Sequence, residues 1–134
     1  MDLEVIKIAE NTTNYKYIKN HSHKYKHKNT ICGDEIEITL KIRDKKIIDF
    51  GYQTKSCIYC QASASLLSRI SKNKKIYEVN GFLKIVNDLF QDEHESTPKY
   101  WKSFNSIFKK DNFQRKDCLL LPVNALKKII NRYD

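Results

Sequence analysis

Long hydrophobic runs and a leader pattern are both missing from this chain. No stretch approaches the roughly 18 consecutive apolar residues of a membrane span. The N-terminus carries acidic residues, Asp2 and Glu4, where a secretory leader would carry basic ones. Repeats and low-complexity tracts are also absent. These absences predict a cytoplasmic protein without membrane association, and a length of 134 residues fits one domain over residues 1–134.

Negative charge is in short supply, since 25 Lys and Arg residues outweigh 16 Asp and Glu residues and leave a net charge of +9. Clustered cations attract polyanions such as nucleic acids. Here the excess is nearly all lysine and is spread along the chain, as a compositional bias of the source genome would produce. A basic zinc module that binds nucleic acid is therefore only the third of three hypotheses.

Cysteine is used four times, in a chain that the missing leader assigns to a reducing compartment. Thiols in such a compartment are more often metal ligands or reactive groups than disulfide partners. The spacing of Cys32, Cys57, Cys60 and Cys118 matches no zinc-finger or ferredoxin run, in which one short loop supplies most ligands. The four cysteines therefore indicate metal binding or sulfur chemistry, and their spacing alone does not identify the kind of site.

A two-residue hydrophobic period marks the strands. Apolar residues alternate with polar ones over residues 35–42, and a second apolar segment follows over residues 47–52. The polar residues 43–46 between them predict an antiparallel hairpin. The lysine-rich residues 21–29 before it fit an exposed edge strand.

Helical spacing dominates the rest of the chain. It predicts helices over residues 3–9, from near Tyr59, over residues 76–90 and, more briefly, around residues 101–108, with an acidic loop at 91–98. Proline is favoured at the first helical position, so Pro122 predicts the start of the final helix. Cys118 then lies just before that helix, and Cys57 lies at a strand-to-helix junction.

Three thiols thus sit at ends of predicted elements, where they are able to converge at one end of a sheet. Asp34 adds an oxygen ligand two residues after Cys32. Three thiolates and one carboxylate suit tetrahedral zinc, and equally suit iron in a cluster with one hard, exchangeable position. Cys60 has two interpretations that stay open: the second member of a Cys57-x2-Cys60 metal or redox pair, or a small buried residue in the first helical turn.

Three motifs carry a resemblance to a known family. They are Cys32-Gly33-Asp34, the segment Cys57-Ile-Tyr-Cys-Gln-Ala-Ser-Ala-Ser, and Arg115-Lys-Asp-Cys118 ahead of Leu-Leu-Leu-Pro. Together they make residues 28–132 resemble the U-type iron–sulfur cluster assembly scaffolds (IscU, SufU and the NifU N-terminal domain), closest to the SufU-like branch. The resemblance implies an α+β fold, with a small antiparallel sheet packed by helices and a metal site at one exposed end of the sheet.

The same resemblance implies a function. A scaffold of this kind receives sulfur from a cysteine desulfurase together with iron, builds a transient cluster, expected to be 2Fe-2S, on Cys32, Asp34, Cys57 and Cys118, and transfers it to apo-proteins. That role involves no catalytic turnover. The alternative is a zinc-dependent sulfurtransferase, an enzyme in which the same residues hold Zn²⁺ and one thiol accepts persulfide. Cys32 is the expected acceptor, because Gly33 follows it and a lysine-rich stretch precedes it.

This sequence departs from the family pattern in one segment, where Asn112-Phe-Gln-Arg115 replaces a Leu-Pro-Pro-Val-Lys-like run of chaperone-dependent members, and at three single positions. Asp117 stands where chaperone-dependent members carry a histidine, Ser56 where a glycine is usual, and Cys60 where a small residue is usual.

Overall fold

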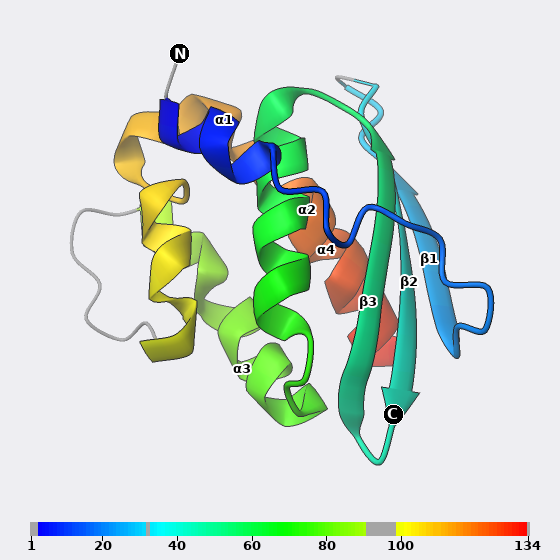
Figure 1. Ribbon diagram of the computed structural model, residues 1–134. Helices are drawn as coiled ribbons and strands as arrows, with labels where there is room; N and C mark the ends of the chain where they lie inside the picture. Colours follow the sequence, from blue (N-terminus) through cyan, green and yellow to red (C-terminus); the bar gives the residue numbers. More distant parts are fainter. Residues whose placement is uncertain (1–2, 32, 91–98, 134) are drawn as a thin grey trace.

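A three-stranded antiparallel sheet forms one layer of the molecule. The computed structural model describes residues 3–31, 33–90 and 99–133. Strands β1 (His23–Lys28), β2 (Glu35–Arg43) and β3 (Lys46–Lys55) are ordered β1-β2-β3. The alternation in β2 buries Ile36, Ile38 and Leu40 on the face that meets the helices. All helices lie on that side of the sheet, which confirms the predicted α+β fold (Figure 1).

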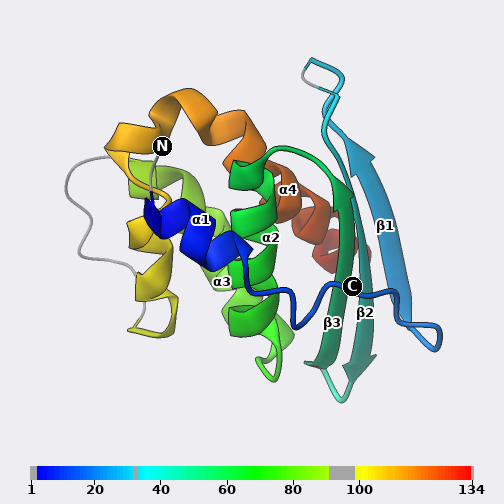
Figure 2. The same ribbon diagram turned by 45° about the horizontal axis from the view of Figure 1, so that its top comes forward.

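Two helices cover the inner face of the sheet. Helix α2 (Ile58–Ser71) packs on β3, and helix α4 (Lys116–Tyr133) packs on β1 and β2 and against α2. Helix α1 (Leu3–Ala9), which matches its prediction, packs against α2. Figure 2 shows α2 standing between α1 and the sheet.

Buried serines tie α2 to its neighbours. Ser63 donates a hydrogen bond of 2.6 Å to the carbonyl oxygen of Leu119 in α4. Ser65 donates one of 2.7 Å to the Asn11 carbonyl. The Ser68 hydroxyl accepts a bond of 3.1 Å from the Asn14 amide. These small side chains leave room for close helix contact and add directional bonds inside an otherwise apolar core.

The segment after α1 crosses the outer face of the sheet at Gly51. Tyr15 pairs with Tyr52 at the β3 edge, and the Ile18 N–H donates to the Thr39 hydroxyl on β2 at 3.1 Å. A Cβ at position 51 would lie 2.7 Å from the Lys16 carbonyl oxygen, so only glycine fits under the crossing. The chain then reaches β1 at the far edge (Figure 1).

The remaining helices pack an aromatic cluster away from the sheet. The helix predicted over residues 76–90 is α-helical only over α3 (Ile76–Ile85) and continues as the 3-10 helix η1 (Val86–Phe90). The helix predicted near residues 101–108 is the 3-10 helix η2 (Lys99–Ser106). Side chains three residues apart eclipse in a 3-10 helix, which suits the spacing of Trp101, Phe104 and Ile107. Trp101 stacks on Phe82 at 4.1 Å between ring centroids. The acidic loop predicted at 91–98 lies outside the described residues.

The predicted start of the last helix at Pro122 is wrong. The 3-10 helix η3 (Lys110–Arg115) leads directly into α4, which begins at Lys116 and contains Pro122 in its interior. Proline has no N–H for the carbonyl four residues earlier, and its ring crowds that carbonyl, which belongs to Cys118. The bond from Ser63 to Leu119 supports the backbone beside this position. Cys118 therefore lies in the first turn of α4 and not before it.

Among the described residues, none of the helices has the length and apolar character needed to span a membrane.

Candidate metal centre

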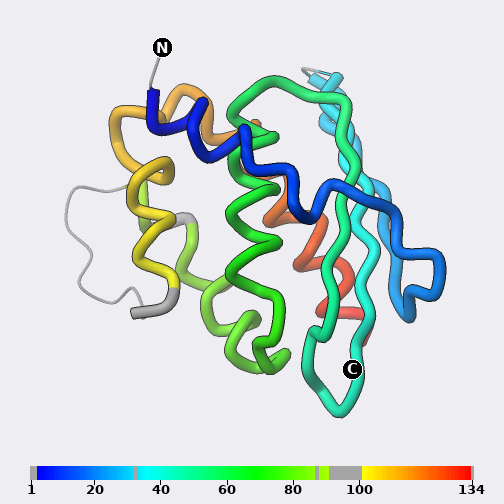
Figure 3. Tube along the Cα trace, in the orientation of Figure 1, coloured from blue at the N-terminus to red at the C-terminus, as the bar shows by residue number. Residues whose placement is uncertain are grey.

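Three connections meet at the same end of the sheet. They are the turn between β1 and β2, the connection from β3 to α2, and the start of α4 (Figure 3). Each contributes one side chain. A carboxylate oxygen of Asp34 and the sulfurs of Cys57 and Cys118 all lie within 4.8 Å of one another. The structure thus brings together three of the four residues predicted as ligands. The fourth, Cys32, lies outside the described residues, two positions before Asp34 in the chain.

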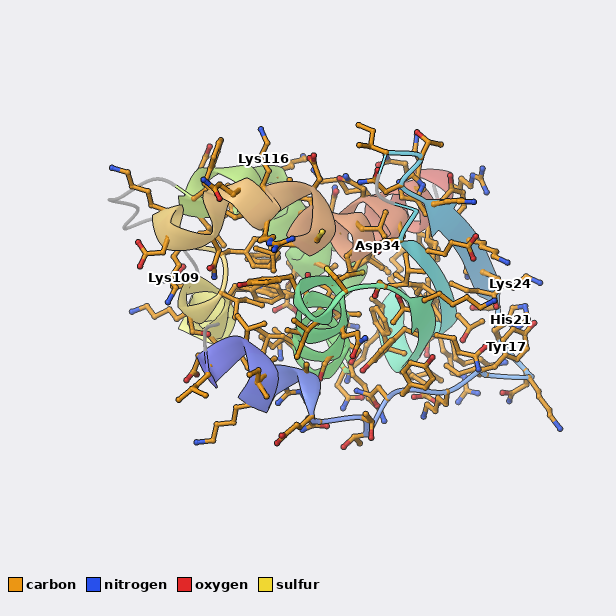
Figure 4. The ribbon with its side chains drawn as sticks, turned by 90° about the horizontal axis from the view of Figure 1, so that it is seen from above. Tyr17, His21, Lys24, Asp34, Lys109 and Lys116 are labelled. Carbon is orange, nitrogen blue, oxygen red and sulfur yellow. The ribbon has the colours of Figure 1, made fainter. Side chains whose placement is uncertain are left out.

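Asp34 is held in place by the backbone of its turn. The Asn29 N–H donates to the Asp34 carbonyl, and the Gly33 N–H donates to the Asn29 carbonyl, each at 2.8 Å. Gly33 has a φ of +80°, in the left-handed region that glycine tolerates best. The turn directs Asp34 inward, toward the helices (Figure 4), and leaves the residue only 9% exposed.

One oxygen of that carboxylate lacks a partner. Asp34 Oδ2 is buried and accepts no hydrogen bond from the described residues. A buried polar atom without a hydrogen bond destabilises the folded state by about 1–3 kcal/mol. A cation bound between Asp34, Cys57 and Cys118 would remove that cost, so the residues present fit a metal.

Both described thiols of the group sit at helix N-termini. Cys57 is the N-cap of α2, with extended backbone angles of −70° and 167°, and its carbonyl accepts the first helical bond from Gln61 at 3.1 Å. Cys118 lies in the first turn of α4. Both thiols are half-buried, which leaves the site open to exchange with solvent or a partner.

Ser63 couples the positions of these two thiols. Its bond to Leu119 joins α2, which begins after Cys57, to the residue that follows Cys118. No sequence pattern predicted a role for Ser63. The available signal was a small polar residue, two positions into the Ala-Ser-Ala-Ser run, on a helix whose other core positions are mostly apolar or alanine.

The spacing of donor atoms fits tetrahedral coordination after a small adjustment. Zinc–sulfur bonds of about 2.3 Å and zinc–oxygen bonds of about 2.0–2.2 Å place ligand atoms roughly 3.5–3.8 Å apart. The 4.8 Å limit observed for the three atoms exceeds this by about an ångström. Two soft sulfurs with one hard oxygen suit Zn²⁺ or iron better than Ca²⁺ or Mg²⁺.

Cys60 lies in the core beside this group. It is 0% exposed, and burial raises the pKa of its thiol to about 12, although hydrogen bonding to Ser56 and Thr54 acts in the opposite direction. It does not belong to the group of three ligand atoms. At neutral pH Cys60 is therefore an uncharged thiol packed in the first turn of α2.

Apolar and basic side chains adjoin the proposed ligands in the chain, and we call this set the rim. Ile31, next to Cys32 in the chain, is 90% exposed. The Arg115 guanidinium lies 5.3 Å from the centre of the Tyr59 ring, and the Lys116 ammonium lies 4.7 Å from that of Phe113. Such a rim suits a partner with acidic and apolar side chains.

Comparison with known proteins agrees with this architecture. The sequence model of the family described as NifU-like N terminal domain matches residues 2–134. The chain belongs to this family. The family relationship predicted from the three motifs is thereby confirmed.

Two proteins of similar sequence are an iron-sulfur cluster assembly scaffold and a zinc-dependent sulfurtransferase. The iron-sulfur cluster assembly scaffold protein IscU 1 of Archaeoglobus fulgidus is 30% identical over 105 residues, which cover 78% of this chain and 58% of that protein. The zinc-dependent sulfurtransferase SufU of Bacillus subtilis is 32% identical over 63 residues, 47% of this chain and 43% of that protein. This chain therefore spans only part of the length of either relative.

A solved structure shares the fold. The putative iron-sulfur cluster assembly scaffold protein for the SUF system from Fervidobacterium islandicum superimposes with a TM-score of 0.83 at 20% identity, over 97% of this chain and 96% of that one.

Proposed function

We propose that this protein is an iron–sulfur cluster assembly scaffold, which receives sulfur and iron, builds a labile cluster and transfers it to apo-proteins. One observation carries the proposal. Asp34, Cys57 and Cys118 come from three separate elements and present their ligand atoms within 4.8 Å of one another. The buried, unpartnered Asp34 Oδ2 supports it, because such an oxygen is satisfied when a cation is bound.

The four proposed ligands have different roles. Cys32, Cys57 and Cys118 supply thiolates, which iron in a cluster prefers, and Asp34 supplies a hard oxygen that exchanges more easily. The cluster is cargo, so one weak ligand favours its release. We propose a 2Fe-2S cluster as the cargo because the family resemblance implies one; four protein ligands suit either a 2Fe-2S or a 4Fe-4S cluster.

Sulfur is proposed to come from a cysteine desulfurase, with Cys32 as the first acceptor. The exposed Ile31 beside it and the basic rim at Arg115 and Lys116 support docking of a protein at this end of the molecule. Exchange requires a thiolate that leaves its ligand position and approaches the donor sulfur in line. Cys57 and Cys118 are fixed at helix starts, which favours Cys32 for this step.

The second candidate function is a zinc-dependent sulfurtransferase, because the same donor set fits Zn²⁺ and the SufU relative carries that description. Asp117 also replaces the histidine found in chaperone-dependent members. Here zinc would hold the thiols until a desulfurase frees one of them.

Metal analysis separates the two. Protein purified without oxygen should contain iron and acid-labile sulfide if it is a scaffold, and zinc without sulfide if it is a sulfurtransferase. Reconstitution with iron and sulfide should give a cluster that persists longer in Asp34→Ala than in the wild type. Equal decay of the two under air would remove Asp34 from the transfer step. Salt-dependent nucleic-acid binding that tolerates Asp34→Ala would favour the third hypothesis instead.

A further inference from the structure

Cys57 and Cys60 both lie at the start of helix α2, three residues apart. Cys57 is the N-cap of α2 and Cys60 is its third helical residue. A rise of 1.5 Å per residue and a radius of 2.3 Å place such Cα atoms roughly 5 Å apart. Disulfides span Cα distances of about 4.4–6.8 Å. The Cα spacing of the pair is therefore within the range that a disulfide spans.

The two thiols differ in access. Cys57 is half-buried at the mouth of the site, whereas Cys60 is 0% exposed behind it. A sulfur donor on another protein is able to reach Cys57 and unable to reach Cys60. Cys60 can react only with a sulfur that is already bound inside the site.

The environment of Cys60 is polar on one side. Its sulfur lies 3.8 Å from the Thr54 hydroxyl, which lies 2.7 Å from the Ser56 hydroxyl and donates to the Glu35 carbonyl at 2.6 Å. Ser56 and Cys60 are both departures from the family pattern, and both contact Thr54. The Cys60 thiol therefore borders a small network of hydroxyl groups and not a wholly apolar pocket.

We propose that Cys57 and Cys60 form a redox pair that releases persulfide sulfur from Cys57 as sulfide. This inference rests on the proposed function, in which sulfur arrives at the site as persulfide, either on Cys57 or by exchange from Cys32. It deepens that function, because a cluster requires sulfide whereas a persulfide carries sulfur two electrons more oxidised. The pair supplies those two electrons from within the chain.

The chemistry balances with the two thiols alone. The Cys60 sulfur attacks the inner sulfur of the persulfide on Cys57, and a new bond forms between the Cys57 and Cys60 sulfurs. The bond between the Cys57 sulfur and the outer sulfur breaks, and the outer sulfur leaves with both electrons of that bond. It takes the Cys60 proton and departs as hydrogen sulfide. The two cysteines are oxidised to a disulfide, and a dithiol reductant in solution would restore them for the next cycle.

Placement compensates for the low reactivity of a neutral thiol. Cys60 is fully buried, and burial in an apolar surrounding disfavours the reactive thiolate form. Well-oriented intramolecular groups reach effective molarities on the order of 10⁵ M or more. A sulfur held on Cys57 therefore reacts, while oxidants in bulk water have little access to Cys60.

The test uses the full chain, reduced and freed of metal with a chelator under argon. Sodium tetrasulfide loads persulfide, excess reagent is removed by gel filtration, and sulfide release is followed over time. The wild type should release about one sulfide per persulfide and acquire a Cys57–Cys60 disulfide in peptide mapping. Cys60→Ala and Cys60→Ser should keep an adduct of about 32 Da on Cys57 and release at least tenfold less sulfide. Ser71→Ala is the matched control, because it changes a buried residue at the other end of α2 and should release sulfide as the wild type does. Cys118→Ser is measured beside it to test whether that neighbouring thiol takes the place of Cys60.

Absence of a Cys57–Cys60 disulfide in the treated wild type overturns the inference, as does equal release from wild type and Cys60→Ala. A release that depends on Cys118 in place of Cys60 also overturns it. Metal loading is measured separately on the same proteins. Wild type that loads iron and sulfide yet forms no disulfide refutes only the redox pair. Wild type that forms the disulfide and loads no metal refutes only the scaffold.

Discussion

Asp34→Ala should be more stable than the wild type without metal and less stable than the wild type with zinc. In the apo protein, Asp34 Oδ2 is buried without a hydrogen-bond partner among the described residues. A buried atom without a partner lowers the free energy of unfolding by about 1–3 kcal/mol. Alanine removes that penalty, but it also removes the packing contacts of the Asp34 side chain, which offsets part of the gain in stability. Apo Asp34→Ala should therefore be more stable than the wild type by about 1 kcal/mol, which raises the midpoint of thermal unfolding by about 3–4 °C.

Zinc should reverse this order. A ligand that binds only the folded state stabilises it by RT ln(1 + [L]/Kd), or about 4.1 kcal/mol at a thousandfold excess over Kd. The wild type should gain this stabilisation, and Asp34→Ala should gain less, because one ligand is missing. Thermal unfolding followed by circular dichroism, with chelator and with zinc, measures both states. Wild type more stable than the variant in both states would show that the carboxylate is a structural group, and the reasoning would fail.

Three further perturbations follow from the packing. Gly51→Ala should destabilise the fold by about 1–3 kcal/mol, because its Cβ would meet the Lys16 carbonyl at 2.7 Å. Gly81→Ala has no atom within 4 Å of its Cβ and should stabilise helix α3 by about 0.5–1 kcal/mol. Equal midpoints of thermal unfolding for the two variants would contradict both expectations. Since burial raises the pKa of Cys60 from 9.0 to about 12, the folded state holds a proton that the unfolded state loses in this range. The wild type should therefore lose stability as pH rises from 9 toward 12, by up to about 1.4 kcal/mol per unit. Cys60→Ala should reduce that loss in urea titrations and leave the part due to Tyr52, because burial raises the pKa of Tyr52 too. Ser63→Ala should lower the free energy of unfolding by about 1–3 kcal/mol. It should also weaken zinc binding, because the bond to Leu119 that positions the two thiols is lost. An unchanged zinc affinity in the variant would show that Ser63 has a structural role only.

The strands and the junction at Cys57 could be predicted because local patterns determine them. The alternation of residues 35–42 matches β2, and the change of period after β3 places Cys57 at the start of a helix, as observed. The start of α4 could not be predicted in the same way. Proline favours a first helical position when only local preference acts. Here the preceding 3-10 helix and the bond from Ser63, 56 residues earlier, outweigh that preference.

The sequence predicted which residues contribute to the site, but only part of how their side chains are arranged. The convergence of Asp34, Cys57 and Cys118 was expected from their places at element ends, and the structure shows these three together. The burial of Cys60 depends on how α2 rotates against β3, and the orphan oxygen of Asp34 depends on the turn at Gly33. Both are tertiary properties that a single sequence does not specify.

The serines of α2 also determine how the two helices that begin at the site are able to move. A slip of α2 along its axis by one residue would be 1.5 Å. It would break the bonds of Ser63, Ser65 and Ser68 together, whereas apolar contacts would re-form after such a slip. Rotation about the long axis is opposed in the same way. The sulfur-to-sulfur distance is thus set by hydrogen bonds deep inside the molecule, and slow fluctuations of the site require their simultaneous rupture. A shift of Asp34 does not require breaking them, because its turn is held by separate backbone hydrogen bonds.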